Sequence, residues 1–325
     1  MGYYLWGHNG SADHADEDWI RGSCRLLSQP PSVISRRPEE ELRYGIGHLA
    51  SLWDRLPEGA AGWALTRRTD SAELLRKSGL RPVLWGWHGA GMSRKLRKDL
   101  EGFHTLVVSD RQSLSVLRTA GLAKKVRLGP DLSFLVERRL RPLSGAFPQD
   151  TIGLCLSAEP HPKEALLYQS YQRLIRYIMT QTDYHVALIP YCARRGREDA
   201  ILHAALEKRF RGWGRVRRRG DGSCQVLRGD LSLCRCVVGS AGAVAAWSCG
   251  VPALCVGATP RFTGLAQELF SNWEDAVVPI SSLSDSETLT RRFRKFLRGE
   301  ERLRKELERA VPLQRQRGLD WKWEF

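Results

Sequence analysis

The sequence has few cysteines and lacks the motifs of several common enzyme classes. Its eight Cys among 325 residues form no CxxC pair. Cys155, Cys236, Cys249 and Cys255 lie in apolar runs, which is typical of buried, reduced thiols. The opening residues have neither the basic start nor the long apolar stretch of a secretory signal. No P-loop, GxSxG or HExxH motif occurs, and the eight His are scattered. We therefore expect a cytoplasmic protein with no metal site and no resident cofactor.

Composition and charge further limit the class of protein and the kind of partner. With 42% hydrophobic and 27% charged residues, the chain is neither disordered nor collagen-like, and its length suits two domains. The 51 Lys and Arg against 36 Asp and Glu give a net charge of +15, which favours anionic partners. A position at an anionic membrane face is compatible with that charge.

One uncharged segment, Cys236–Pro260, is long enough to cross a membrane. Its glycines and Pro252 instead divide it into a strand, a small-residue helix and a second strand. We predict a buried β-α-β unit there.

Apolar strands alternate with helices along the whole chain, which predicts doubly wound parallel sheets. In the first half we expect strands at 3–6, 82–85, 105–108 and 126–128, and helices at 16–27, 39–56, 71–78 and 111–120. In the second half we expect strands at 152–156, 185–189, 236–238 and 253–256, and helices at 162–181, 198–210 and 287–310. The aperiodic stretch 137–150 separates them. The prediction is α/β, with Rossmann-like domains at 1–145 and 146–325 facing a cleft.

The glycine-rich segment after the first strand, GHNGSADH, is the first candidate site. Gly10 lets the backbone approach a ligand, Ser11 offers a hydroxyl, and His8 and His14 can transfer protons near neutral pH. A glycine turn with a helix-capping residue explains the same pattern without a ligand.

Three arginines after predicted strands are candidates for binding an anion. Arg111 begins a helix, Arg194 lies in an Arg-rich loop, and Arg261 follows the strand at 253–256. Solvated surface arginines give the same pattern. The basic run 208–219, with Trp213 among seven basic residues, fits a surface loop better than a nucleic-acid site, so we expect no nucleic acid as partner.

A second small-residue loop begins at Gly239 and Ser240 and leads into a predicted helix. Backbone N–H groups in such a loop can hold a phosphate or diphosphate. Close packing of a helix on a sheet is the alternative reason for small residues there.

These segments, in this order, resemble the polysaccharide pyruvyl transferase family over nearly the whole chain. The segments that carry the resemblance are GYYLWGHNGSADHADEDWIRG, VLWGW, SDRQSLSVLRTAG with VRLGPDLSF, and ALIP, CRCVVG, AAWS, VPALCVG and GLAQELF. The resemblance implies a GT-B-like enzyme that moves the pyruvyl unit of phosphoenolpyruvate onto two sugar hydroxyls, in a glycan or lipid-linked acceptor of surface-polysaccharide biosynthesis. Among the matched positions, it implies a catalytic role for Arg111 and a substrate-binding role for Asp131.

The sequence departs from the family's pattern at two loops of the second half. Gly239–Gly242 stands where members carry an Arg-x-His pair, and Pro190-Tyr191 stands where many read Pro-His. Two alternatives therefore stay open. One is a glycosyltransferase that holds a nucleotide diphosphate at this loop, with Glu268 as a further contact, and the other is a family member without catalytic activity.

Overall fold

The computed structural model describes residues 2–8, 14–27, 31–35, 51–53, 55–56, 58–141, 150–157, 162–192, 199–220, 222–257 and 259–321. By their contacts the residues group into two compact units. Unit 1 comprises Met1–Ala12, Asp16–Val136 and Leu313–Phe325, and unit 2 comprises Asp13–Ala15 and Glu137–Pro312.

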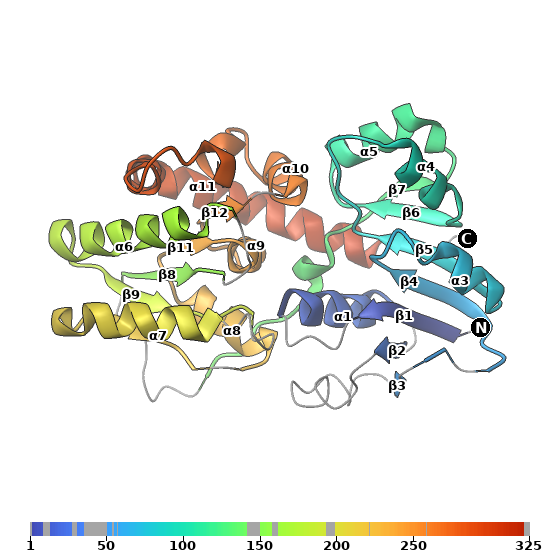
Figure 1. Ribbon diagram of the computed structural model, residues 1–325, viewed down its shortest axis with the longest axis horizontal. Coiled ribbons are helices and arrows are strands. Elements are labelled where there is room, and N and C mark those ends of the chain that lie inside the picture. The colour runs from blue at the N-terminus through green and yellow to red at the C-terminus, as the bar shows by residue number, and fades with distance from the viewer. Residues whose placement is uncertain are drawn as a thin grey trace. The chain divides into compact units, whose positions relative to one another are not determined.

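Unit 1 is built on a seven-stranded sheet in which every neighbouring pair is parallel (Figure 1). In spatial order its strands are β3 (Ser51–Trp53), β2 (Ser32–Ser35), β1 (Gly2–His8), β4 (Gly62–Thr66), β5 (Leu80–Trp85), β6 (Thr105–Val108) and β7 (Val126–Leu128). Its helices are α1 (His14–Leu26), α3 (Ala72–Lys77), α4 (Arg94–Glu101), α5 (Arg111–Leu117), the π-helical turn η1 (Arg118–Leu122) and the 3-10 turn η2 (Leu132–Leu135).

The unit 1 strands are apolar on both faces because helices cover both faces of a doubly wound sheet. Alternate residues of β5 belong to different core clusters. Val83 and Trp85 pack with Ile20 of α1, whereas Leu84 packs with Leu114 of α5. The burial of continuous runs such as this one stabilises the sheet and fixes its register.

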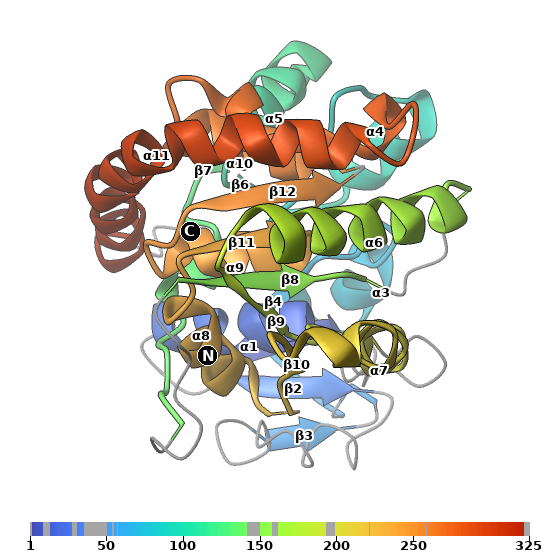
Figure 2. The same ribbon diagram turned by 90° about the vertical axis from the view of Figure 1, so that its left-hand side faces the viewer.

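Unit 2 is a six-stranded parallel sheet with helices on both faces. In spatial order its strands are β10 (Val216–Arg218), β9 (His185–Leu188), β8 (Thr151–Cys155), β11 (Cys236–Gly239), β12 (Ala253–Gly257) and β13 (Val277–Pro279). Figure 2 shows α6 (Glu164–Gln181), α7 (Asp199–Phe210) and α11 (Thr288–Leu319) in front of this sheet. The remaining helices are α8 (Cys224–Ser232), α9 (Ala241–Ser248), α10 (Pro260–Leu269) and the short turns η3 (Arg211–Trp213), η4 (Trp273–Asp275) and η5 (Ile280–Ser282).

The uncharged segment Cys236–Pro260 forms β11, α9 and β12, as predicted. Trp247 of α9 is fully buried, and its Nε1 donates to the carbonyl of Ala253 at 3.0 Å. Among the helices that the structure describes, none is both long enough and apolar enough to span a bilayer.

The last helix, α11, contains residues of both units. Pro312 lies inside it, and the residues from Leu313 group with unit 1. There Arg315 Nε donates to the carbonyl of Phe134 at 3.3 Å, and Trp321 packs edge-on against Trp85. The prediction assigned all of this helix to the second domain and placed the boundary at 145/146, among residues 142–149 that lie outside the described residues.

In unit 1, one predicted element is wrong and three further strands or α-helices were not predicted. The helix predicted at 39–56 is wrong at Ser51–Trp53, which forms strand β3 because it pairs in parallel with β2; residues 39–50 lie outside the described part. Strands β2 and β4 and helix α4 were not predicted. Strand β4 lies between β1 and β5 in the sheet. Its run, Gly-Trp-Ala-Leu-Thr, is too short and too mixed to indicate a strand by itself.

Candidate functional site

The loops that follow β5, β6 and β7 meet at one edge of the unit 1 sheet. The three strands are parallel neighbours, so their carboxyl ends point the same way. Gly86 N donates to Val107 O at 2.9 Å, and Gly129 N donates to Val108 O at 2.8 Å. Ligands of doubly wound folds bind at this edge, so side chains on these loops are the first candidates for chemistry.

His88 and Asp110 form a hydrogen-bonded pair on two of these loops. The distance from His88 Nδ1 to Asp110 Oδ2 is 2.9 Å, and the two side chains are 10% and 1% exposed. Asp110 also caps α5, since its Oδ1 accepts from Ser113 N at 2.7 Å. Two bonds therefore fix the carboxylate, and the carboxylate in turn orients the imidazole.

The ionisation of Asp110 decides which nitrogen of His88 carries the proton. Burial by itself would raise the pKa of this carboxyl, but the hydrogen bonds from His88 and Ser113 lower it more, and its pKa lies below the usual value. An ionised carboxylate can only accept, so Nδ1 of His88 must be the donor. Nε2 is then the ring nitrogen that can exchange a proton with a ligand.

Arg111, the arginine predicted to clamp an anion, is the residue directly after Asp110. It is exposed and begins α5, while Asp110 supplies the helix cap. Neither His88 nor Asp110 is among the site residues predicted from the sequence. The usable signal was a histidine three residues after the predicted strand 82–85, in the run Leu-Trp-Gly-Trp-His.

Asp131 lies at the same edge, after β7, and is buried. Its Oδ1 accepts from Ser133 N at 3.0 Å and from Ser133 Oγ at 2.5 Å, which caps η2. The loop is held from the other side by Trp85, whose Nε1 donates to Pro130 O at 3.3 Å. These contacts give Asp131 a role in shaping the loop, and its predicted contact with substrate stays a prediction.

The predicted glycine-rich site is described only in part. His8 ends β1 and His14 begins α1, but neither side chain is among those described. Gly10, Ser11 and Arg194 lie outside the described residues. Their proposed roles stay predictions.

In unit 2, the loop at Gly239–Gly242 follows β11 and begins α9. A Cβ on Gly239 would lie 2.6 Å from the carbonyl oxygen of Cys155, and one on Gly242 would lie 2.5 Å from Cys155 Sγ. The glycines are thus required for close packing on β8, which supports the structural alternative for this loop. Ser240 is partly buried and makes no side-chain cap bond to α9. Arg261 is partly buried in the first turn of α10, and Glu268 is partly buried near its end.

Buried polar groups near the carboxyl ends of β8 and β9 serve the packing of α7. Asp199 Oδ2 accepts from the backbone N–H groups of Tyr191 and Cys192 at 2.9 and 2.8 Å. His203 is fully buried, and its Nε2 lies 3.2 Å from Leu156 O. Burial lowers the pKa of His203 to about 4, so it is neutral at physiological pH.

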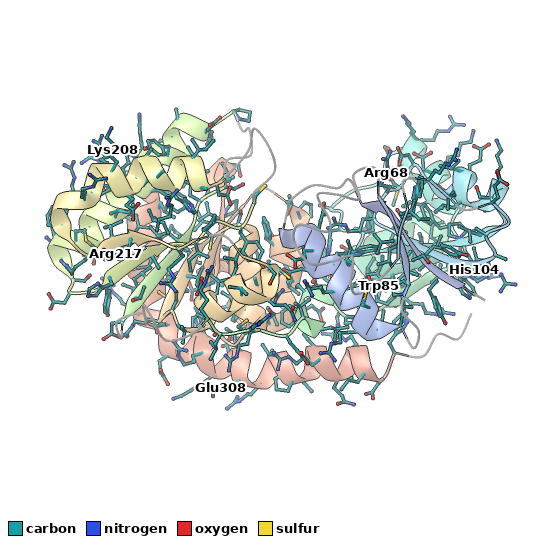
Figure 3. The ribbon with its side chains drawn as sticks, turned by 90° about the horizontal axis from the view of Figure 1, so that it is seen from below. Arg68, Trp85, His104, Lys208, Arg217 and Glu308 are labelled. Atoms are coloured by element: carbon teal, nitrogen blue, oxygen red, sulfur yellow. The ribbon has the colours of Figure 1, made fainter. Side chains whose placement is uncertain are left out.

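In the basic run 208–219, some side chains stabilise the fold and others are exposed to solvent. Arg215 donates to the carbonyls of Met179, Thr182 and Tyr184 and thereby satisfies carbonyl groups at and just after the C-terminal end of α6. Lys208 and Arg217 are exposed and lie at the periphery of unit 2 (Figure 3). Most of the run is exposed, as expected, but it is not a loop: it ends α7 and forms η3 and strand β10. Within the described residues, no group of three or more His, Cys, Asp or Glu could hold a metal ion.

Solved structures define the class of fold. A glycosyltransferase from Rickettsia africae matches with a TM-score of 0.58 at 10% identity, covering 98% of this chain and 96% of that one. The S. aureus MnaA structure with UDP matches with a TM-score of 0.64 at 10% identity, covering 95% and 90%. A sucrose-phosphate synthase from Thermosynechococcus elongatus matches with a TM-score of 0.59 at 13% identity, covering 98% and 96%. The chain has a GT-B-like fold, as predicted.

The family follows from the sequence. The profile of the polysaccharide pyruvyl transferase family matches residues 59–259, so the chain belongs to this family. His88, Asp110, Arg111 and Ser240 lie inside the matched region, whereas His8, His14 and Arg261 lie outside it. A comparison with curated proteins gives no match.

Proposed function

We propose that this protein transfers the pyruvyl group of phosphoenolpyruvate onto two hydroxyls of a sugar, forming a cyclic ketal. The observation that carries the proposal is the His88–Asp110 pair, next to Arg111, at the carboxyl edge of the unit 1 sheet. Membership of the family supports the class of reaction. The pair supplies a histidine for proton transfer in a chain whose Gly239–Gly242 loop has none.

The reaction makes two C–O bonds and breaks one. The methylene carbon of phosphoenolpyruvate takes up a proton and becomes a methyl group, while one sugar hydroxyl adds to the adjacent carbon. The second hydroxyl adds to the same carbon as its bond to the phosphate oxygen breaks, and inorganic phosphate leaves. Of the two hydroxyl protons, one balances the proton taken up by carbon and the other leaves with phosphate, so no oxidant or reductant is needed.

His88 is suited to the proton transfers because the Asp110 carboxylate accepts from its Nδ1 and orients the ring. A buried carboxylate bonded to Nδ1 holds the ring in one tautomer and leaves Nε2 to give and receive the proton. Arg111 is suited to the donor because a guanidinium binds carboxylate or phosphate oxygens in a bidentate geometry. Asp131, Arg194, Gly239, Ser240 and Arg261 stay proposed contacts to substrate.

The proposed acceptor is a glycan or a lipid-linked sugar in surface-polysaccharide biosynthesis. The net charge of +15 favours an anionic donor and is compatible with work at an anionic membrane face. All eight cysteines are free thiols, which supports the proposed cytoplasmic location.

The test is direct incubation of the protein with phosphoenolpyruvate and a set of methyl hexosides in D2O. The proposal expects release of phosphate together with an acidic ketal product, detected by mass spectrometry, whose new methyl group carries deuterium. His88→Gln should lower both signals about a hundredfold or more without loss of folding. A parallel reaction with UDP-sugars tests the glycosyltransferase alternative, and sugar transfer there without ketal formation would overturn the proposal.

A further inference from the structure

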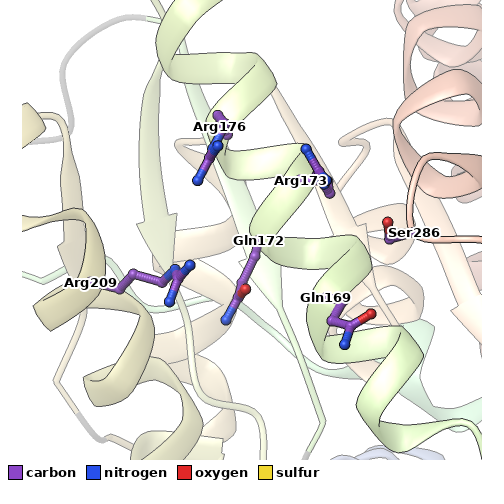
Figure 4. A pocket seen from close by; sticks show the side chains of 6 residues that line it. All are labelled: Gln169, Gln172, Arg173, Arg176, Arg209 and Ser286. Carbon is purple, nitrogen blue, oxygen red and sulfur yellow. The ribbon is translucent and has the colours of Figure 1, made fainter.

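The outer surface of unit 2 carries a polar hollow of about 220 Å³ between α6, α7 and the turn before α11 (Figure 4). We call it the α6 hollow. It is lined by Gln169, Gln172, Arg173, Arg176, Arg209 and Ser286, and none of these residues is apolar. Its size is below the roughly 300–1,000 Å³ of pockets that enclose a drug-sized ligand, so it suits a single small polar unit.

The helix geometry of α6 gathers four of these side chains on one face. Gln169, Gln172, Arg173 and Arg176 have the spacing i, i+3, i+4, i+7, which places them above one another along the helix. Arg209, near the end of α7, points toward Gln172 across the hollow (Figure 4). A cationic group thus faces an amide from the opposite side.

The positive charge of the α6 hollow is only partly balanced. Arg173 Nε lies 3.3 Å from Glu287 Oε1, and both side chains are half-exposed. Within the part of the chain that the structure describes, neither Arg176 nor Arg209 forms an ion pair. Two guanidinium groups therefore remain available at one small polar surface, and an anion there would gain attraction from both.

The mixture of side chains indicates what kind of anion fits. Guanidinium groups match the planar oxygens of carboxylates and phosphates, whereas glutamine amides both donate to and accept from hydroxyl groups. A simple inorganic anion would use only the arginines. A sugar that carries an acidic group would use the arginines, the glutamines and Ser286 together.

We propose that the α6 hollow binds a saccharide unit bearing a carboxylate or a phosphate, separately from the reaction. The residues that line the hollow come from α6, the end of α7 and the turn before α11, and none comes from the loops after β5, β6 and β7 where the reaction is proposed. A site in this position holds part of an acidic glycan chain and raises its local concentration. The proposal goes beyond the proposed function and does not depend on which reaction occurs.

The test is binding of saccharide probes to the full chain, measured by calorimetry at low and moderate salt. The probes are trigalacturonate for the carboxylate form, mannose 6-phosphate for the phosphate form, neutral maltotriose and inorganic phosphate. The variant is Arg176→Gln with Arg209→Gln. The matched control is Arg118→Gln with Arg298→Gln, which removes the same charge from exposed helical positions outside the hollow.

We expect at least one acidic saccharide to bind more tightly than maltotriose and inorganic phosphate, with affinity about tenfold or more lower in the hollow variant and unchanged in the control. Equal weakening in both variants would show non-specific attraction and overturn the proposal. Binding of inorganic phosphate as tight as that of the acidic saccharides would overturn the saccharide assignment, and so would absence of binding to either acidic probe. Circular dichroism melting confirms that both variants fold.

Discussion

Replacing Asp110 by Asn separates the two tasks of this carboxylate, because one oxygen caps α5 and the other holds His88. Asn is about as good a helix cap as Asp, so the bond from Ser113 N survives. The bond to His88 loses its charge, and hydrogen bonds to charged groups contribute about 1.5–3 kcal/mol. Part of that loss is offset, because the side chain at position 110 is only 1% exposed and a neutral amide costs less to bury than a carboxylate. We expect the free energy of unfolding to fall by about 1–2 kcal/mol.

The effect on activity should be much larger than the effect on stability. With an amide NH2 facing it, Nδ1 of His88 must accept rather than donate, so the proton moves to Nε2. The neutral ring then presents a donor where the reaction needs an acceptor. Loss of a positioned acid or base costs about 10²–10⁴-fold in rate, and we expect kcat for ketal formation to fall in that range.

The assay compares kcat from phosphate release with the free energy of unfolding from urea denaturation. Ser223→Ala is the control, because Ser223 caps α8 in unit 2 and accepts from Val226 N at 3.4 Å. It should cost about 1 kcal/mol of stability and leave kcat unchanged. His88→Gln should lower kcat as far as Asp110→Asn does, and the double variant should lower it no further.

An Asp110→Asn variant that is destabilised as expected but keeps the kcat of the wild type would contradict a role of this pair in proton transfer. The His88–Asp110 pair would then be a structural contact alone. Additive losses in the double variant would also contradict the argument, because two members of one proton-transfer unit cannot act independently.

Three further predictions follow from other parts of the molecule. Arg111→Lys should raise KM for phosphoenolpyruvate about tenfold or more, because an ammonium cannot make the bidentate contact; an unchanged KM in steady-state kinetics would remove Arg111 from the donor site. His203 is neutral in the fold and its pKa is lowered to about 4, so the unfolded state binds its proton first as the pH falls. The contribution of His203 to the free energy of unfolding is complete above about pH 6.5 and is lost toward pH 4, at up to roughly 1.4 kcal/mol per pH unit. In His203→Gln the free energy of unfolding, measured by urea titration at several pH values, should depend less steeply on pH in this range. The same pH dependence in the variant and the wild type would contradict this. Gly242→Ala should lower the free energy of unfolding by about 1–3 kcal/mol because the new Cβ meets Cys155 Sγ. Gly212→Ala should cost little, because no heavy atom lies within 4 Å of its new Cβ. Thermal unfolding compares the two variants, and equal melting points would contradict the role of Gly242 in packing.

The sequence by itself determined the elements whose pattern is local. Strands at Thr105–Val108 and Val126–Leu128 have the predicted bounds, and the uncharged segment from Cys236 forms the predicted β-α-β unit. Runs of buried apolar residues between glycines and capping residues are read along the chain, so no knowledge of neighbours is needed. The same local reasoning failed at Ser51–Trp53, where pairing with β2 decides the conformation.

Only the tertiary structure decided which side chains meet. His88 and Asp110 are 22 residues apart and come together because β5 and β6 are adjacent and parallel, a fact about sheet order rather than about either segment. Trp321 packs against Trp85 for the same kind of reason. Helical and strand periodicity reach only a few residues along the chain, whereas sheet order is set by burying apolar faces across the whole unit. The chemistry proposed here therefore depends on contacts that no single segment of the sequence contains.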